Sequence, residues 1–188
     1  MRHTGTIVLD TDRLRLRRFT VDDAEKMFEN WAGNPEVTKY LPWKFYADCN
    51  GVKRYLAELE EKYKAPDFYD WCIEWRENGE PIGSVGAVQI CERLSSVGVG
   101  YCLSEKYWGK GVVPEALNAV LKHFFVTLGA VRVTGAHFVE NAKSGKVLKK
   151  CGFTEEGVLR KGAMNNEGAF VDAKLYSITD DEYFKRGK

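Results

Sequence analysis

The stretch that decides the fold is EKYWGKGVVPEAL, residues 105–117, which places two glycines and a lysine between a strand-like run and an amphipathic helix. The apolar residues that recur at helical spacing are Leu117, Val120, Leu121, Phe124 and Leu128. Gly129 follows them where a glycine commonly ends a helix. The first N–H groups of a helix lack intrahelical partners, and glycine lets a ligand approach the backbone. These residues therefore predict a local anion site at a helix N-terminus.

The commoner phosphate-binding motifs do not fit this loop. A Walker motif needs Ser or Thr after its lysine, whereas Lys110 is followed by Gly111. The dinucleotide fingerprint needs a third glycine where Pro114 stands. A tight strand-to-helix turn without any ligand remains an alternative for this loop alone, so other parts of the chain must decide.

Composition limits the classes of function. The 188-residue chain has the length of about one domain, and we expect a single domain over residues 1–188. Its 28 Lys and Arg residues nearly balance its 27 Asp and Glu residues, which argues against a nucleic-acid-binding protein. The five cysteines are far apart without a C-x-x-C pair, so neither a disulfide framework nor a metal site is expected. No run resembles a signal peptide or a membrane span, which favours a cytoplasmic protein without a membrane partner.

Hydrophobic patterning predicts a mixed α/β fold with about four helices. Helices are expected at residues 20–33 and 51–65, from the glycine loop to Leu128, and at 142–150. Strands are expected at residues 13–19, 69–75, 82–90, 95–103, 131–138, 153–160 and 169–178. The early strands are expected to form an antiparallel meander, whereas the strand–helix–strand crossovers in the second half must be parallel. The proline-containing segment 33–45 is expected to be a loop.

Five phrases in order carry a resemblance that covers about Thr11 to Ile178. They are TDRLRLRRF, PIGSVG, VGYCLSEKYWGKGVVPEAL, ENAKSGKVLKKCGF, and EGVLRKG followed by FVDAKLYSI. Together they resemble the GNAT superfamily of acetyl-coenzyme A-dependent N-acetyltransferases, and more closely its ribosomal-protein N-terminal (RimJ/RimL-type) branch. The resemblance implies the GNAT fold, with an antiparallel N-terminal half and parallel, splayed central strands.

The resemblance also implies a cofactor site. In the family this loop holds the pyrophosphate of acetyl-CoA, which here implicates Trp108, Gly109, Lys110, Gly111, Val112 and Val113. Trp108 replaces the usual Gln or Arg, Val113 replaces a smaller residue, and Pro114 lacks an N–H, so modest affinity is expected. The family further implies that the backbone of the preceding strand serves the thioester, at Tyr101, Cys102 and Leu103.

Asn141 and Ser144 supply the second half of the implied site. On propensity alone Asn141 is a helix N-cap that accepts from the Ser144 N–H, and in the family it also meets the pantetheine arm. Many members place a tyrosine acid where Leu148 stands, whereas the RimJ/RimL branch has a serine at the position of Ser144. Ser144 is thus the expected catalytic acid, with an ordinary first-turn helix residue as the alternative. Nearby lysines could steer the 3′-phosphate, or could form a solvated helix face: Lys143, Lys146, Lys149 and Lys150.

The general base cannot be assigned from the sequence. The branch often has a glutamate before the loop strand, but Gly98 occupies that position. Glu74, Glu92 and Asp172 lie on or near strands, where carboxylates mostly face solvent, and deprotonation through water is an equal alternative. The three histidines are scattered without partners for nucleophilic or metal chemistry: His3, His123 and His137.

We therefore expect acetyl transfer from acetyl-CoA to a primary amine, without a metal. The first choice of acceptor is the N-terminal amine of a ribosomal or other protein. A small amine such as an amino acid, polyamine or drug is the alternative, and a non-catalytic coenzyme A-binding sensor is a third hypothesis that the missing glutamate keeps open. The aromatic content of 13% and the branch's frequent self-association suggest a homodimer, although an aromatic acceptor cleft explains the same residues.

Overall fold

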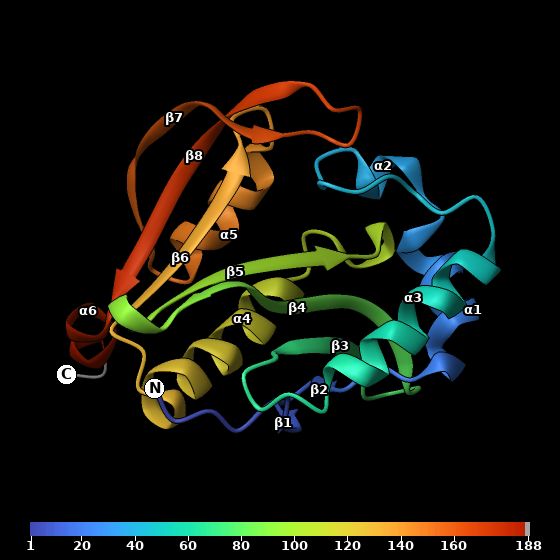
Figure 1. Cartoon of the computed structure of the whole chain (residues 1–188), viewed down its shortest axis with the longest axis horizontal. Coiled ribbons are helices and arrows are strands. Elements are labelled where there is room, and N and C mark those ends of the chain that lie inside the picture. The colour runs from blue at the N-terminus through green and yellow to red at the C-terminus, as the bar shows by residue number, and fades with distance from the viewer. Residues whose placement is uncertain (187–188) are drawn as a thin grey trace.

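The computed structural model describes residues 1–186 and is built around one eight-stranded mixed sheet (Figure 1). The strands are β1 (Leu9–Asp10), β2 (Leu14–Arg17), β3 (Asp70–Trp75), β4 (Glu80–Cys91), β5 (Ser96–Leu103), β6 (Arg132–Phe138), β7 (Thr154–Met164) and β8 (Phe170–Thr179). Their spatial order is β1-β2-β3-β4-β5-β6-β8-β7. Within the described residues every neighbouring pair is antiparallel except β5 and β6. The predicted mixed sheet with a parallel centre is confirmed.

Six α-helical segments occur in residues 1–186, two more than the approximate count expected. They are α1 (Ala24–Met27), α2 (Pro35–Thr38), α3 (Cys49–Lys62), α4 (Val112–Lys122), α5 (Ala142–Lys150) and α6 (Asp180–Lys185). The predicted helix at 20–33 is a series of 3₁₀, α and π turns, of which α1 is one. α2 forms in the segment predicted to be a loop, because Pro35 suits a first turn and the Asn34 side chain caps the Glu36 N–H at 2.9 Å.

The second predicted crossover, from β6 through α5 to β7, joins two strands that run in the same direction but do not pair with each other. β5, α4 and β6 form the expected parallel unit, but α5 leads from β6 to a strand that is not its neighbour. β8 lies between β6 and β7 and pairs antiparallel with both. The reason is local: β7 and β8 are joined by a short turn around residues 165–169, and strands of a hairpin pair antiparallel.

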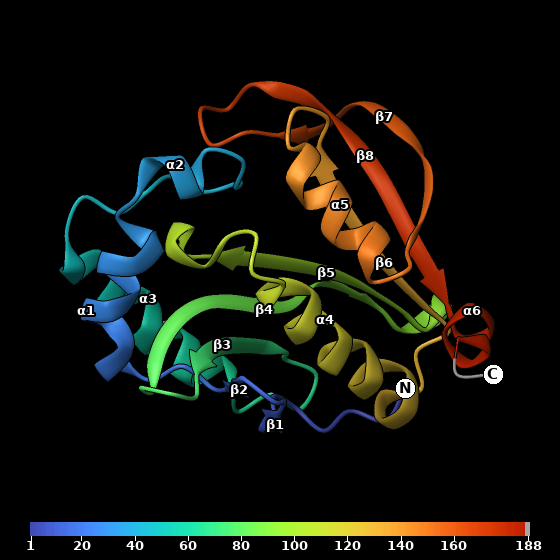
Figure 2. The same cartoon turned by 180° about the vertical axis from the view of Figure 1, so that it is seen from behind.

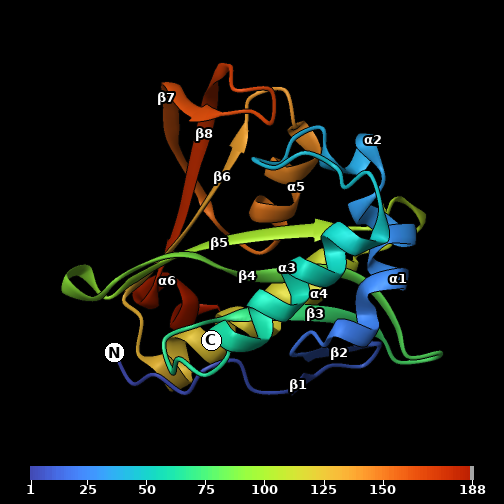
Figure 3. The same ribbon diagram turned by 45° about the vertical axis from the view of Figure 1, so that its right-hand side comes forward.

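Helices cover both faces of the sheet. α1 and α3 lie on one face of β2–β4 and α4 lies on the other, while α5 lies against β6 on the same side as α4 (Figures 2 and 3). Leu117 and Val120 of α4, and Phe124 in the π-helical turns that follow it (His123–Leu128), are fully buried, as their spacing predicts. Each contributes about 2–3 kcal/mol of burial energy. On the opposite face Leu56 and Trp31 are equally buried in a second cluster. The two layers fix the central strands from both sides.

The central strands diverge, and this divergence positions the site. β5 pairs with β6 from Ser96–Arg132 only as far as Val99–Gly135, after which the strands separate (Figure 1). At this level β4 carries a bulge, with Val88 inserted between residues that pair with β5. A bulge increases the local twist of a strand. The last part of β5, residues 100–103, therefore keeps its pairing with β4 and has a free edge toward β6.

Candidate active site

The glycine loop presents backbone N–H groups at the start of α4. Gly109 and Gly111 have φ near +75°, a backbone conformation that residues other than glycine rarely adopt. The first helical hydrogen bond runs from Glu115 N to Gly111 O at 3.2 Å, so the N–H groups before it have no intrahelical partner. The side chains of Val112 and Val113 are buried in the core, so only their backbone N–H groups could contact a ligand. The loop thus has unpaired backbone donors and two positive-φ glycines at a helix N-terminus, which are the features that an anion site needs, while Pro114 lacks a donor.

Arg13 completes this loop, and sequence reasoning gave it no role. Its guanidinium pairs with Glu115 at 2.7 Å and donates to Lys110 O at 3.1 Å. Burial opposes ionisation of Glu115, but hydrogen bonds from Thr11 and Arg13 lower its pKa overall. The pair neutralises a carboxylate in the first turn of α4, where a free negative charge would repel an anion. The sequence alone does not indicate this ion pair, because Arg13 and Glu115 are 102 positions apart.

Trp108 fastens the loop to the end of β5. Its indole N–H donates to Leu103 O at 2.9 Å, and its ring packs against both core clusters. The Lys143 ammonium lies 4.6 Å from the centre of this ring, so one of the predicted steering lysines reaches the loop. Lys149 instead pairs with Glu155 at 2.9 Å. At the position where the family usually has a polar residue, Trp108 therefore holds the loop against the end of β5 through its hydrogen bond to Leu103 O.

The N-terminus of α5 faces the opening between β5 and β6. Asn141 caps this helix as predicted, and its side chain accepts from the Ser144 N–H at 3.4 Å. The Tyr101 hydroxyl lies 2.8 Å from Ser144 Oγ and also donates to Ser144 O at 3.1 Å. Burial raises the pKa of Tyr101 above its ordinary value, although the bond with Ser144 opposes the shift. Ser144 and Tyr101 are brought together across the opening, 43 residues apart.

The other two implied residues of β5 are buried beside Tyr101. Cys102 and Leu103 are less than a tenth exposed, so their side chains belong to the core. Burial raises the pKa of the Cys102 thiol to about 12, which leaves it protonated and unsuited to nucleophilic chemistry. What these residues offer to a ligand is the free backbone edge of β5 described above.

The carboxylates considered as bases are engaged elsewhere. Glu74 pairs with Arg17 at 2.5 Å, and Glu92 pairs with the N-terminal amine at 3.3 Å and with His3. Asp172 accepts from the Lys161 N–H at 2.7 Å. Asp172 alone of these three carboxylates lines a cavity near the opening.

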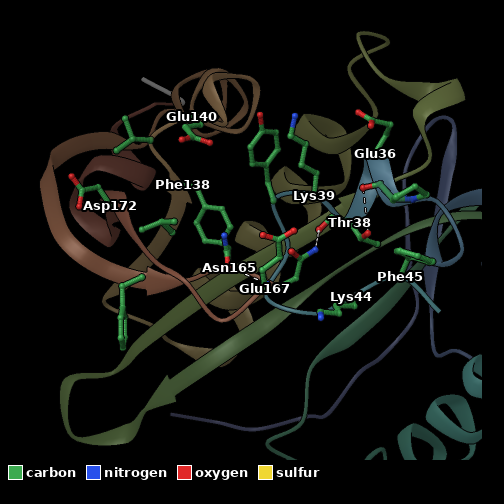
Figure 4. Close-up of a pocket in the computed structure, with 16 residues that line it drawn as sticks. Glu36, Thr38, Lys39, Lys44, Phe45, Phe138, Glu140, Asn165, Glu167 and Asp172 are labelled. Carbon is green, nitrogen blue, oxygen red and sulfur yellow. Dashed lines mark hydrogen bonds between the residues drawn. The ribbon is translucent and has the colours of Figure 1, made fainter. Parts of the chain in front are cut away.

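That cavity has a volume of about 820 Å³ and lies beyond the end of β6 (Figure 4). It is open to solvent on one side and is lined by the segment around α2, by residues 138–140, and by the β7–β8 turn with the start of β8. The Asn166 side chain joins two of these segments by donating to Thr38 O at 3.1 Å. Its charged lining comprises the carboxylates of Glu36, Glu140, Glu167 and Asp172 and the ammonium groups of Lys39 and Lys44. Its aromatic lining comprises Tyr40, Phe45, Phe138 and Phe170. Three of the four carboxylates come from late segments of the chain: Glu140, Glu167 and Asp172.

Neither a metal centre nor a membrane span is found in the part of the chain that the structure describes. No three His, Cys, Asp or Glu side chains of residues 1–186 are grouped so as to hold a metal ion. None of the described helices has the length and apolarity to cross a bilayer.

Comparison with known proteins places these features in a family. The model of the acetyltransferase (GNAT) domain matches residues 13–154. The uncharacterized N-acetyltransferase YoaA of Bacillus subtilis is 32% identical over 171 residues, which cover 91% of this chain and 96% of that protein. The [ribosomal protein uS5]-alanine N-acetyltransferase of Escherichia coli is 26% identical, over 93% of this chain and 92% of that protein. The crystal structure of a ribosomal-protein-S5-alanine acetyltransferase from Vibrio fischeri superposes with a TM-score of 0.81 at 26% identity, over 94% of this chain and 98% of that one.

Proposed function

The chain belongs to the GNAT acetyltransferase family, and from that membership we propose that it acetylates the N-terminal amine of a ribosomal or other protein with acetyl-CoA. One observation carries the proposal. The opening between β5 and β6 has the N–H groups of the α4 N-terminus on one side and Ser144 on the other. The large cavity begins at the end of β6, with Glu140 immediately before the Asn141 cap.

The residues present fit acetyl-CoA. The donors that would hold its pyrophosphate are the backbone N–H groups of residues 109–113, which need the two positive-φ glycines and the neutralised Glu115. The free edge of β5 at Tyr101, Cys102 and Leu103 would hold the pantetheine and thioester end. Asn141 has an amide N–H₂ that is not used in capping and is available to this arm. Acetyl-CoA supplies the activated acetyl group.

Two tasks then fall to residues of this chain, and a third falls to water. Backbone N–H groups on the free edge of β5 would stabilise negative charge on the carbonyl oxygen. The Ser144 hydroxyl would pass its proton to the sulfur as it departs and would regain one from the water that deprotonates the acceptor. A cationic amine loses two protons as it becomes an amide: one replaces the proton that Ser144 gives to the thiol, and the other is released to solvent. We assign both removals to water, because Gly98 offers no carboxylate and Glu74 is paired with Arg17.

The cavity lining favours a cationic acceptor with an apolar neighbour. Four carboxylates outnumber two lysines there, and the aromatic rings offer contact surface. Its volume of about 820 Å³ has room for the first residues of a polypeptide. The named activity of the E. coli relative, on a ribosomal protein, supports a protein acceptor for this chain. A small amine remains the second candidate, because the same charges attract it.

One assay separates the three hypotheses. Thiol release from acetyl-CoA is measured with peptides that have free N-termini, with the same peptides blocked at the N-terminus, and with amino acids, polyamines and aminoglycoside-type drugs. We expect release that requires the free peptide N-terminus. Release with small amines alone would favour the second candidate. Binding of acetyl-CoA without release for any amine would favour a coenzyme A sensor and contradict the proposal.

A further inference from the structure

The Tyr101 hydroxyl makes two hydrogen bonds to the same residue across the opening. Its oxygen lies 3.1 Å from Ser144 O and 2.8 Å from Ser144 Oγ. Tyr101 lies on the part of β5 that no longer pairs with β6, and Ser144 is in the first turn of α5. No other side chain of residues 1–186 makes a hydrogen bond to the Ser144 hydroxyl. The position of this hydroxyl group is therefore tied to Tyr101.

Counting hydrogens shows that the pair has two arrangements. Each hydroxyl carries one hydrogen, and a carbonyl oxygen only accepts. If Tyr101 donates to Ser144 O, the short contact is made by the Ser144 hydroxyl donating to Tyr101. If Tyr101 instead donates to Ser144 Oγ, the serine hydrogen is free to point elsewhere. The two arrangements have the same heavy-atom positions and differ only in which way two hydroxyl hydrogens point.

We propose, on the basis of the function proposed above, that Tyr101 is a positioning residue that holds Ser144 Oγ in place and switches the direction of the serine hydrogen. With no charge in the opening, Tyr101 donates to the carbonyl and the serine hydrogen points at Tyr101. As negative charge develops on the departing sulfur, the serine hydrogen turns to the sulfur and Tyr101 turns its own hydrogen to Ser144 Oγ. The tyrosine loses its bond to the carbonyl and the serine gains a charge-assisted bond, which is the stronger of the two.

Tyr101 keeps its proton throughout. Because burial raises the pKa of Tyr101 above its ordinary value, the phenol is a poorer acid than a free tyrosine. A thiol has an ordinary pKa of about 8.5, so the thiolate would gain little by taking the tyrosine proton. The role of Tyr101 is thus to orient Ser144, and no bond to its own hydrogen is broken.

A double-mutant cycle with Tyr101→Phe and Ser144→Ala tests this role. The phenylalanine keeps the ring and removes only the hydroxyl. We expect Tyr101→Phe to lower kcat by roughly 3- to 10-fold, the worth of one hydrogen bond, with little change in the KM for acetyl-CoA. Because Tyr101 acts through Ser144, the same change in the Ser144→Ala background is expected to have no further effect on kcat.

A matched control removes a hydroxyl that makes the same kind of contact elsewhere. Tyr63, the C-cap residue of α3, donates to Asp70 O at 2.9 Å and makes no hydrogen bond to Ser144. Tyr63→Phe is expected to lower the melting temperature and to leave the kcat ratios of the cycle unchanged.

The outcomes separate this role from the proposed function. If Tyr101→Phe lowers kcat by the same factor with and without Ser144, Tyr101 does not act through the serine and the inference is wrong, while the acetyltransferase stands. A Tyr101→Phe protein with wild-type kcat also overturns the inference alone. A wild-type protein that binds acetyl-CoA but releases no thiol with any amine overturns the proposed function and this role with it.

Discussion

A carboxylate placed at residue 111 should expel the cofactor while leaving the fold intact. Gly111 has φ 75° at the N-cap of α4, and a Cβ there would meet only Arg13 Nη2, at 3.8 Å. Asp and Asn are the side chains that best tolerate this conformation. Arg13 is already engaged by Glu115, so the added charge of Gly111→Asp is uncompensated.

The size of the effect follows from Coulomb's law. A carboxylate about 5 Å from a bound phosphate charge costs about 0.8 kcal/mol at the dielectric of water and about 3.3 kcal/mol at an effective dielectric of 20. This range corresponds to an increase in Kd from about 4-fold to a few hundredfold. At a ligand concentration of 100 times the wild-type Kd, acetyl-CoA stabilises the native state by about 2.7 kcal/mol. A 100-fold weaker variant retains about 0.4 kcal/mol under the same conditions.

Thermal unfolding with and without acetyl-CoA measures this difference. For a domain of this size the wild-type melting temperature should rise by about 5–10 °C, and that of Gly111→Asp by about 1–2 °C. Gly111→Asn is the matched control, because it has the same shape and no charge, and it should keep most of the wild-type shift. Equal shifts in folded Gly111→Asp and Gly111→Asn would refute the assignment of the loop as the pyrophosphate site.

Four further predictions concern packing, charge and assembly. A Cβ at Gly145 would lie 2.6 Å from His137 Nε2, so Gly145→Ala should cost about 1–3 kcal/mol in urea unfolding; unchanged stability would contradict this packing. Arg17→Met leaves the buried Asp23 without its partner at 2.7 Å and should cost about 3–5 kcal/mol, which the same titration measures. Burial raises the pKa of Asp70 to about 7, above its unfolded value near 3.9. The free energy of unfolding should therefore fall as the pH rises from about 4 to 7, and Asp70→Asn should abolish that slope. Sedimentation at micromolar concentration should show a homodimer, and a 21.4 kDa species alone would exclude it.

The sequence predicted the elements whose signals are local. The spacing of residues indicated the glycine loop, the apolar face of α4 and the end of the whole helical run at Gly129, which has φ 77° and follows the π-helical turns after α4. The Asn141 cap followed from its place before α5. Each of these depends on residues within a few turns of one another.

What the sequence did not predict depends on long-range register. The ion pair of Arg13 with Glu115 and the bond of Tyr101 with Ser144 join residues 102 and 43 positions apart. The insertion of β8 beside β6 follows from the hairpin that closes β7, and crossover rules alone do not foresee it. The acidic cavity is assembled from three segments, none of which is distinctive by itself.

Turnover of Ser144→Ala tests most directly whether acetyl transfer takes place in the opening between β5 and β6. The substitution removes the hydroxyl, whereas Tyr101 keeps its bond to the backbone oxygen of residue 144 and Asn141 still caps the N–H, so stability and cofactor binding should barely change. At pH 7 we expect kcat to fall by roughly 100-fold or more, as general acid catalysis predicts. The deficit should shrink as the pH rises through about 8.5, where the thiolate departs without a proton. Full turnover of Ser144→Ala at pH 7 with a good acceptor would contradict the account, because water would then protonate the thiolate and the serine would be only a helix residue.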